Sequence, residues 1–188
     1  MTTESPQDAA LLVRIQDGDR GAFAALVQKH HETFYHLAYR YMQSRDEAED
    51  MVQTAFLKLW EYPDRWNPEK GGKFTTWFYR VVVNLCLDAQ KKHKTSALPE
   101  SFEAEDSSPN QEIRAMSKQT HAALEKQLAT LPDRQRMALI LCFYQELPHK
   151  EAAGVMRISV KALRSLLMRA KTTLSKQMKP YLTEARYG

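Results

Sequence analysis

The 188-residue sequence has only two cysteines, and it has no apolar run long enough to cross a membrane. Cys86 and Cys142 both lie within apolar stretches, and no Cys-x-x-Cys pair or spaced set of Cys and His accompanies them. We therefore expect neither a disulfide framework nor a metal site, and we assign no cofactor. The first residues are polar, and the longest apolar stretches are far shorter than the roughly 20 residues that span a bilayer. We expect a soluble, cytoplasmic protein without membrane insertion.

Glycine is also scarce, with six residues, which argues against a β-sandwich or barrel because such folds need a turn about every ten residues. Ala, Leu, Lys, Gln and Arg, which favour helices, are abundant. Hydrophobic residues make up 43% of the chain and charged residues 27%, which is close to the globular average and sufficient to build a core. The composition therefore predicts an all-α protein, in one domain or two small ones.

Charge is distributed unevenly along the chain. Residues 1–94 have a net charge of 0, residues 95–113 have −5 and residues 114–188 have +9. The middle segment contains several Ser and Pro and few large apolar residues, so it cannot bury enough surface to fold alone. We therefore predict two small helical domains, residues 8–94 and 114–182, joined by a flexible acidic linker over residues 95–113. A basic final third is typical of a nucleic-acid-binding module, although it also fits a solvated helix face.

The first half shows helical periodicity, with apolar residues three and four positions apart from Asp8 to Met42. Asp17-Gly18-Asp19 divides this stretch into a short and a long helix, and Ser44 is a suitable N-cap for a third helix over residues 46–60. Four acidic residues lie near the start of that third helix, where the helix dipole alone favours them. The predicted buried stripe is Ala48, Val52, Ala55, Phe56 and Leu59, and the predicted outer face includes Glu49, Asp50, Gln53 and Lys58.

A loop rich in Pro, Gly and Asn follows over residues 63–72, and it places Trp66 among charged residues. A fourth helix is predicted over residues 75–92, where cationic and polar side chains are interspersed with aromatic ones. Rings that stack on bases, together with cations that neutralise phosphates, are what a groove for single-stranded nucleic acid requires. Aromatic residues at helical spacing are also usual in a helical core, so the periodicity leaves both interpretations open.

The last third predicts a helix-turn-helix motif, whose second helix enters the DNA major groove. A short helix over residues 148–156 is followed by a turn over residues 157–159 and by a long basic helix, for which Ser159 is the expected N-cap. In the helix before this motif, either Phe143 or Tyr144 faces the core. The exposed face of the long helix is predicted to contain Lys161, Arg164, Ser165, Met168, Arg169 and Lys171.

Four motifs occur in one order along the chain. They are Glu47 to Trp60, Phe74 to Asn84, Leu131-Pro132-x-x-Gln135-Arg136, and the Ile158-Ser159-Val160 turn followed by Arg169-Ala170-Lys171. Each motif is weak alone, but together they resemble the extracytoplasmic-function (ECF, group 4) sigma factors, which are sigma-70 family subunits of bacterial RNA polymerase. The resemblance covers about residues 9–178.

The resemblance implies a function for each predicted domain. Residues 8–94 would form sigma domain 2, which binds the β′ clamp helices of core RNA polymerase and melts the −10 element of promoter DNA. Residues 114–182 would form sigma domain 4, which binds the β flap and reads the −35 element. The residues implied in clamp docking are Glu49, Asp50, Gln53 and Lys58. Those implied in −10 contacts are Trp66, Lys73, Trp77, Tyr79, Arg80 and Asn84, and those implied in −35 contacts are Lys161, Arg164, Ser165, Met168 and Arg169.

The resemblance adds more detail on partners and roles. It implies that Asn84 helps to hold a flipped base, with the loop from Trp66 to Lys73 as one wall of the base pocket. Arginines of the long helix would bind guanine or phosphate. It also implies an anti-sigma factor that covers the polymerase-binding faces, and no catalytic residue, since sigma factors are not enzymes. Arg157 departs from the family pattern, because it occupies a turn position often filled by Gly, where a positive φ costs other residues roughly 1 kcal/mol.

Two other functions are compatible with parts of the sequence. A helix-turn-helix regulator that binds duplex DNA as a dimer, without polymerase, accounts for residues 114–188 but leaves the N-terminal half without a role. The spacing of His30, His31, Glu32 and His36 suggests a metal-dependent enzyme. These residues lie in one helix, with no matching ligand pair elsewhere and no Gly-rich phosphate loop, so solvated or partly buried histidines are the plainer interpretation.

Overall fold

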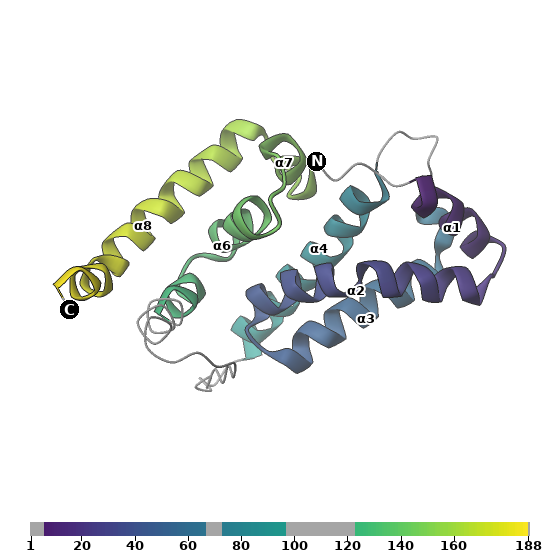
Figure 1. Ribbon diagram of the computed structural model, residues 1–188, viewed down its shortest axis with the longest axis horizontal. Helices are drawn as coiled ribbons and strands as arrows, with labels where there is room; N and C mark the ends of the chain where they lie inside the picture. Colours follow the sequence, from purple (N-terminus) through teal and green to yellow (C-terminus); the bar gives the residue numbers. More distant parts are fainter. Residues whose placement is uncertain (1–5, 67–72, 97–122, 188) are drawn as a thin grey trace.

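The computed structural model describes residues 6–66, 73–96 and 123–187, and in these residues every regular element is helical (Figure 1). This confirms the all-α prediction. Along the described ranges, none of the helices is both apolar and long enough to cross a bilayer. The elements are α1 (Pro6–Gln16), α2 (Arg20–Met42), α3 (Arg45–Glu61), the 3₁₀ turn η1 (Pro63–Arg65), α4 (Phe74–Ser96), a helical segment over 123–129, α6 (Asp133–Leu139), the π-helical segment η3 (Ile140–Tyr144), α7 (His149–Val155) and α8 (Val160–Tyr187).

The helix boundaries follow from local capping chemistry. Gly18 adopts a positive φ of 81°, and the Asp19 carboxylate accepts a hydrogen bond from the backbone N–H of Ala22 (3.0 Å), so α1 ends and α2 begins at the predicted position. Gln43 closes α2 in the left-handed conformation, and the Ser44 hydroxyl accepts from the backbone N–H of Glu47, which makes Ser44 the N-cap of α3 as predicted. Observed bounds differ from the expected ones by a few residues at most, as fraying helix ends do.

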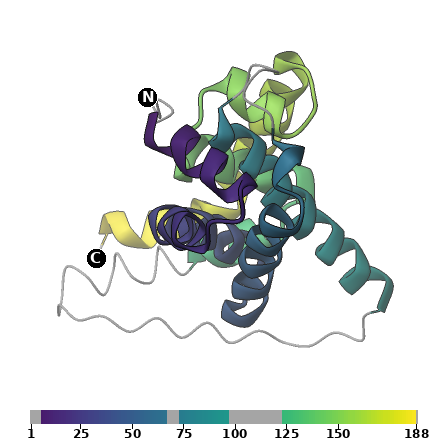
Figure 2. The ribbon, with the colours of Figure 1, turned by 90° about the vertical axis from the view of Figure 1, so that its right-hand side faces the viewer.

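The first half packs as a bundle in which α2 lies between α1 and α3, and α4 closes the other side (Figures 1 and 2). The predicted stripe of α3 is buried in full. Aromatic rings fill the centre of the bundle, with Phe34 and Phe56 each 4.7 Å from Phe78 between ring centroids. Such ring pairs add to the area buried by each side chain, so the bundle has a well-specified core.

In the second half, α6 packs against α8 and η3, and α7 packs against α8 and η3. Ser159 caps α8 by accepting from the backbone N–H of Ala162 at 3.1 Å, as predicted. Arg157 in the preceding turn has a φ of 52°, which confirms that this position requires the left-handed conformation. Phe143 is 50% exposed and Tyr144 is half-buried, so Tyr144 is the residue of that pair that faces inward.

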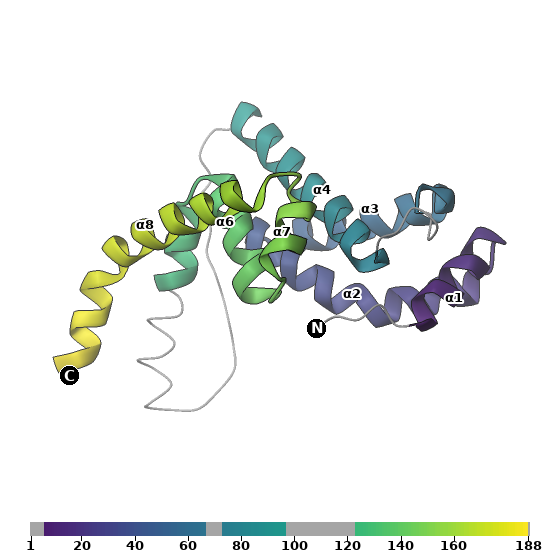
Figure 3. The ribbon, with the colours of Figure 1, turned by 90° about the horizontal axis from the view of Figure 1, so that it is seen from above.

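The two halves lie against each other, with α7 beside α4 and η3 beside α2 (Figures 1 and 3). Thr95 and Ser96, the first two residues of the predicted acidic linker, are instead the last residues of α4. Its remaining residues, 97–113, and the predicted start of the second domain, residues 114–122, lie outside the described residues. The domain bounds derived from composition therefore stay a prediction.

Candidate functional site

The outer face of α3 presents the residues predicted to dock on the polymerase clamp. Asp50, Gln53 and Lys58 are exposed, and Glu49 is half-exposed. They lie here because Ala48, Val52 and Ala55 turn the opposite face of the helix into the core. The four side chains therefore share one accessible surface, while their role in docking stays a prediction.

Glu49 is held in place by neighbours on two helices. Its carboxylate oxygen Oε1 accepts from Gln53 Nε2 at 3.1 Å and lies 3.2 Å from His31 Nε2 of α2. These hydrogen bonds, that from Gln53 first, favour the charged form and hold the pKa of Glu49 below its usual range. Sequence reasoning placed Glu49 on this face but missed His31 as its partner, since no local periodicity links α2 to α3.

The residues predicted to contact the −10 element lie on and before α4, but they are not equally accessible. Asn84 is exposed, and Trp77 is half-buried beside Phe74 and Phe78. Trp66 was predicted to form a wall of a base pocket, but its side chain is only 3% exposed and its ring packs edge-on to Phe74 at 6.1 Å. The indole ring is therefore a core residue here, because its apolar surface is better removed from water.

Three of these −10 candidates contact the second half of the chain: Tyr79 is buried, and Lys73 and Arg80 are half-buried. The contacts are Lys73 Nζ to Glu151 Oε1 (3.0 Å), Tyr79 OH to Gln145 Oε1 (3.0 Å) and Arg80 Nε to Gly154 O (3.0 Å). Burial raises the pKa of the Tyr79 hydroxyl to about 12, and the nearby Glu151 carboxylate is a smaller cause of this shift. The sequence pattern points to no role for Gln145, Glu151 or Gly154, because no spacing signal within either half pairs them with α4.

The residues predicted to read the −35 element share the outward face of α8. Lys161, Arg164, Met168 and Arg169 are exposed, and the Met168 side chain is 65% exposed. Ser165 is half-buried, and its hydroxyl donates to the backbone carbonyl of Lys161 at 3.1 Å, so it is partly engaged within its own helix. Leu163, Leu167 and Ala170 anchor the opposite face in the core. A cationic helix face of this kind suits the major groove.

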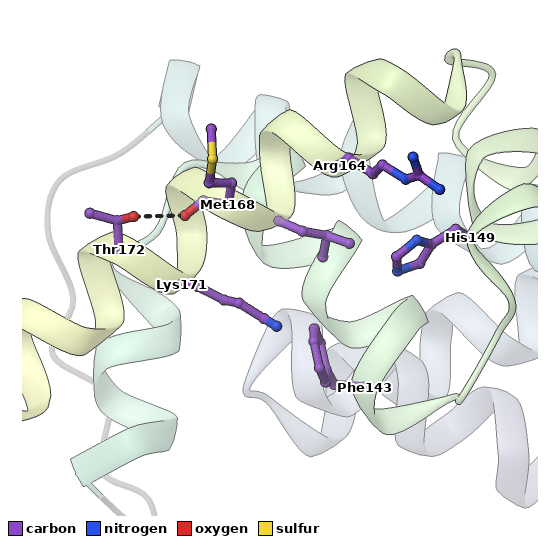
Figure 4. A pocket seen from close by; sticks show the side chains of 7 residues that line it. Phe143, His149, Arg164, Met168, Lys171 and Thr172 are labelled. Atoms are coloured by element: carbon purple, nitrogen blue, oxygen red, sulfur yellow. Dashed lines mark hydrogen bonds between the residues drawn. The ribbon is translucent and has the colours of Figure 1, made fainter.

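A groove of about 340 Å³ lies beside this helix and is lined by side chains of α8, η3 and α7 (Figure 4). The side chains that line the groove are basic and apolar, and they include the exposed ring of Phe143. Lys171 Nζ lies 4.5 Å from the centroid of this ring in a cation–π arrangement. Sequence reasoning missed the groove, although the exposed ring was one of the two alternatives at positions 143 and 144. The lining residues are Phe143, His149, Arg164, Leu167, Met168, Lys171 and Thr172.

The histidine cluster does not assemble a metal centre in the described ranges, where no group of three or more His, Cys, Asp or Glu side chains is positioned to hold an ion. His30 Nε2 lies 3.1 Å from the buried Asp8 carboxylate, which also pairs with Lys29 at 2.7 Å. His36 lies 3.6 Å from Glu32 on the exposed side of α2. In this structure His30 and His36 make contacts between and within helices.

Each half of the chain matches the model of a known protein family. Residues 26–95 match the model of sigma-70 region 2, and residues 121–174 match that of sigma-70 region 4. In the structure, region 2 spans most of α2 to α4, and region 4 spans the helical segment over 123–129 through the greater part of α8. The faces of α3, α4 and α8 described above therefore fall within the two matched regions.

Two solved structures share the fold. CnrH, in complex with the cytosolic domain of CnrY, has a TM-score of 0.69 at 22% identity and covers 93% of this chain and 98% of its own. The sigma factor RpoE of Bartonella quintana, in complex with the anti-sigma factor NepR, has a TM-score of 0.67 at 20% identity and covers 84% of this chain and 96% of its own.

Sequence relatives extend over nearly the whole chain. The ECF RNA polymerase sigma-E factor of Escherichia coli strain K12 is 29% identical, over 96% of this chain and 98% of the relative. The RNA polymerase sigma-H factor of Pseudomonas aeruginosa is 32% identical, over 95% of this chain and 97% of the relative. With both regions matched in order and a relative 32% identical over 97% of its length, the chain belongs to the sigma-70 family of RNA polymerase sigma factors.

Proposed function

We propose that this protein is an alternative sigma factor of the ECF class, group 4, which binds bacterial core RNA polymerase in the cytoplasm and directs it to specific promoters. The observation that carries the proposal is the separation of two surfaces with different chemistry. Region 2 presents a mixed acidic face on α3, and region 4 presents a cationic face on α8, whose exposed residues include Arg164 and Arg169.

Each surface suits a different partner. Exposed carboxylates such as Asp50 offer a protein partner charge complementarity and hydrogen-bond acceptors, and they repel phosphates. Exposed arginines on a helix after a tight turn suit guanine edges and phosphates of duplex DNA. On this basis α3 docks on the β′ clamp helices and α8 reads the −35 element. The family resemblance further implies that region 4 binds the β flap.

In this proposal the aromatic and polar residues of α4 bind the −10 element. Asn84 is the accessible member of this group, one helical turn beyond Arg80, and we assign it to the flipped base of the melted strand. Trp77, Tyr79 and Arg80 of α4, together with Lys73 just before that helix, supply stacking surface, hydrogen bonds and positive charge. Trp66 supports this surface from within the core by packing on Phe74.

We also propose that the activity is controlled by an anti-sigma factor. The Bartonella sigma factor was solved with the anti-sigma factor NepR, and CnrH was solved with the cytosolic domain of CnrY, which supports a protein partner of this kind for this chain. Co-purification of tagged protein from its native cell, followed by mass spectrometry, tests this. Recovery with core polymerase subunits alone, under conditions in which the sigma factor is inactive, would contradict it.

Reconstituted transcription tests the sigma function itself. The protein is mixed with core RNA polymerase and a library of genomic fragments, and the 5′ ends of the transcripts are sequenced. We expect start sites that share two upstream motifs and that are absent with core enzyme alone. A helix-turn-helix regulator acting without polymerase would instead bind duplex DNA tightly by itself and add no start sites, and that result would overturn the proposal.

A further inference from the structure

An exposed methionine lies in the middle of the cationic face of α8. The Met168 side chain is 65% exposed, the largest value among the exposed large apolar side chains of the described residues, followed by Leu57 at 56%. With 3.6 residues per turn, Arg164 lies about 40° to one side of Met168 around the helix, and Arg169 lies about 100° to the other side. The Met168 side chain therefore lies between the two arginines proposed to read the −35 element.

Met168 points away from the aromatic ring of the neighbouring groove. Figure 4 shows Lys171 directed toward the Phe143 ring, and the Lys171 ammonium lies 4.5 Å from the ring centroid. In the same view Met168 projects in the opposite direction. The ring of Phe143 is thus partly covered by Lys171, whereas most of the apolar surface of Met168 is in contact with water.

An apolar side chain at this place needs a partner other than a phosphate. Phosphate oxygens are bound by cations and N–H or O–H donors, so a helix that held phosphates alone would gain nothing from a thioether. Water around an apolar side chain is unfavourable in proportion to the exposed area, and this area contributes to affinity only when a partner covers it. The position of Met168 therefore indicates an apolar group on the partner.

The major groove of DNA offers one such group on its base edges. Guanine, adenine and cytosine present hydrogen-bond donors and acceptors there, whereas thymine also presents its C5-methyl group. The unbranched and polarisable side chain of methionine adapts to a small apolar group of this kind. An arginine on each side of Met168 suits guanine edges or phosphates next to the methyl group.

The hydroxyl groups beside Met168 direct their protons into the helix. Ser165 donates to the backbone carbonyl of Lys161 at 3.1 Å, and Thr172 donates to that of Met168 at 2.9 Å (Figure 4). These protons are therefore not aimed at acceptors on a base. Recognition in the middle of this face is left to cations and to the apolar surface of Met168.

We propose that Met168 is a specificity-determining residue, whose side chain covers the C5-methyl group of a thymine in the −35 element. The proposal rests on the proposed function for the identity of the DNA. Between Arg164 and Met168, α8 rises about 6 Å, which is close to two base-pair steps of about 3.4 Å. The thymine therefore lies within about two base pairs of the contact that Arg164 makes.

Replacement of thymine by deoxyuridine tests this contact, because the two bases differ only in the C5-methyl group. The promoters are those found by reconstituted transcription, and each thymine of the −35 element, on either strand, is replaced in turn. Fluorescence anisotropy of labelled promoter duplex measures its affinity for the holoenzyme. At one position we expect binding to weaken about fourfold, close to the gain from burying one methyl group. A thymine between the −35 and −10 elements, replaced in the same way, is the DNA control.

Variants at position 168 assign the effect to this side chain. Met168→Gln keeps the length of the side chain but replaces its apolar tip with an amide, so the holoenzyme should bind the thymine and deoxyuridine promoters equally. Met168→Leu keeps an apolar side chain and should retain most of the fourfold difference. Thr172→Ala, at an exposed position one turn further along α8, is the matched control and should retain all of it. None of these variants should alter the salt dependence of binding, because none changes a charge.

Two results would overturn the proposal: no −35 thymine whose replacement weakens binding, or a Met168→Gln holoenzyme that is as sensitive to the replacement as the parent. Each result is a ratio between two duplexes bound by the same protein, so a change in the overall affinity or stability of a variant does not enter. Failure of the sigma function would appear earlier, as the absence of new start sites with core polymerase, and the −35 contact of Met168 would fall with it.

Discussion

The guanidinium of Arg136 donates a hydrogen bond from Nη2 to the backbone carbonyl of Arg40 at 3.2 Å, across the boundary between region 4 and region 2. Arg40 lies in the last turn of α2, so its carbonyl is one of those that the helix cannot satisfy itself. The same guanidinium lies 5.1 Å from the centroid of the Tyr41 ring. One buried cation thus caps a helix of the other half, while burial lowers its pKa below the usual range of arginine.

Arg136→Ala is therefore expected to lower the free energy of unfolding by about 1–3 kcal/mol, because it leaves a part-buried helix-end carbonyl without its donor and removes buried side-chain atoms. Urea denaturation followed by circular dichroism measures the change. Arg134→Ala is the control, since Arg134 is exposed on the same helix and should change stability by less than about 0.5 kcal/mol. Equal stability of the two variants would show that Arg136 contributes nothing net.

Asp50→Ala is expected to weaken binding to core RNA polymerase before any DNA is present, because it removes an exposed carboxylate from the proposed clamp face. Fluorescence anisotropy with labelled protein and purified core enzyme measures the affinity. Asp88→Ala, which removes an exposed carboxylate from α4, should leave it unchanged. Unchanged core binding by Asp50→Ala would refute the assignment of this face.

Asn84→Ala is expected to block promoter opening and to leave core binding and −35 contacts intact, because Asn84 is the exposed residue of α4 assigned to the flipped base. Permanganate reactivity of thymines reports melting, and closed-complex formation is measured in parallel on the same promoter. Gln90→Ala, at a half-exposed position further along α4, is the control. If Asn84→Ala opened promoters like the parent, the assignment of the base pocket would be wrong.

Arg164→Ala and Arg169→Ala are expected to weaken promoter binding by the holoenzyme by about 1–3 kcal/mol each if the lost contact reads a base. A phosphate contact would instead weaken binding to all sequences alike and reduce its salt dependence. Binding to wild-type and −35-substituted promoters over a range of salt separates the two cases. Lys176→Ala, at an exposed position further along α8, should have a smaller effect, and equal losses at 164 and 176 would argue against specific reading.

The stability of the protein should fall at high pH because of Cys86. Burial raises the pKa of this thiol to about 12, so it ionises far less readily in the folded protein than in the unfolded chain, whose reference value is 9.0. Its contribution to stability is complete below pH 9 and is lost as the pH rises toward 12, by up to about 1.4 kcal/mol per pH unit.

Urea denaturation of the parent and of Cys86→Ala between pH 7.5 and 10.5 checks this expectation. The two curves should converge above pH 9, because the variant lacks the thiol while both proteins keep the buried Tyr41 and Tyr79 hydroxyls. A difference between them that stays constant over this range would show that the thiol is not protected by the fold.

The sequence by itself determined the helices, their caps and the family. Each of these depends on residues that are close along the chain, such as the apolar stripe from Ala48 to Leu59, Ser44 and Ser159 at helix starts, and the turn at Arg157. Helical periodicity states which face of a helix is apolar, and a capping residue acts on its own first turn, so neither needs knowledge of the rest of the fold.

Only the tertiary structure decided what covers each face. Periodicity does not reveal that Trp66 folds into the core, that Arg136 caps α2, or that Glu151 and Gly154 engage Lys73 and Arg80. The contacts made by Arg136, Glu151 and Gly154 join residues more than 70 positions apart. A side chain with both apolar surface and a polar tip suits a core, a partner helix or a DNA strand alike. The choice depends on which element lies opposite, because the packing of the whole chain determines which surfaces lose their water.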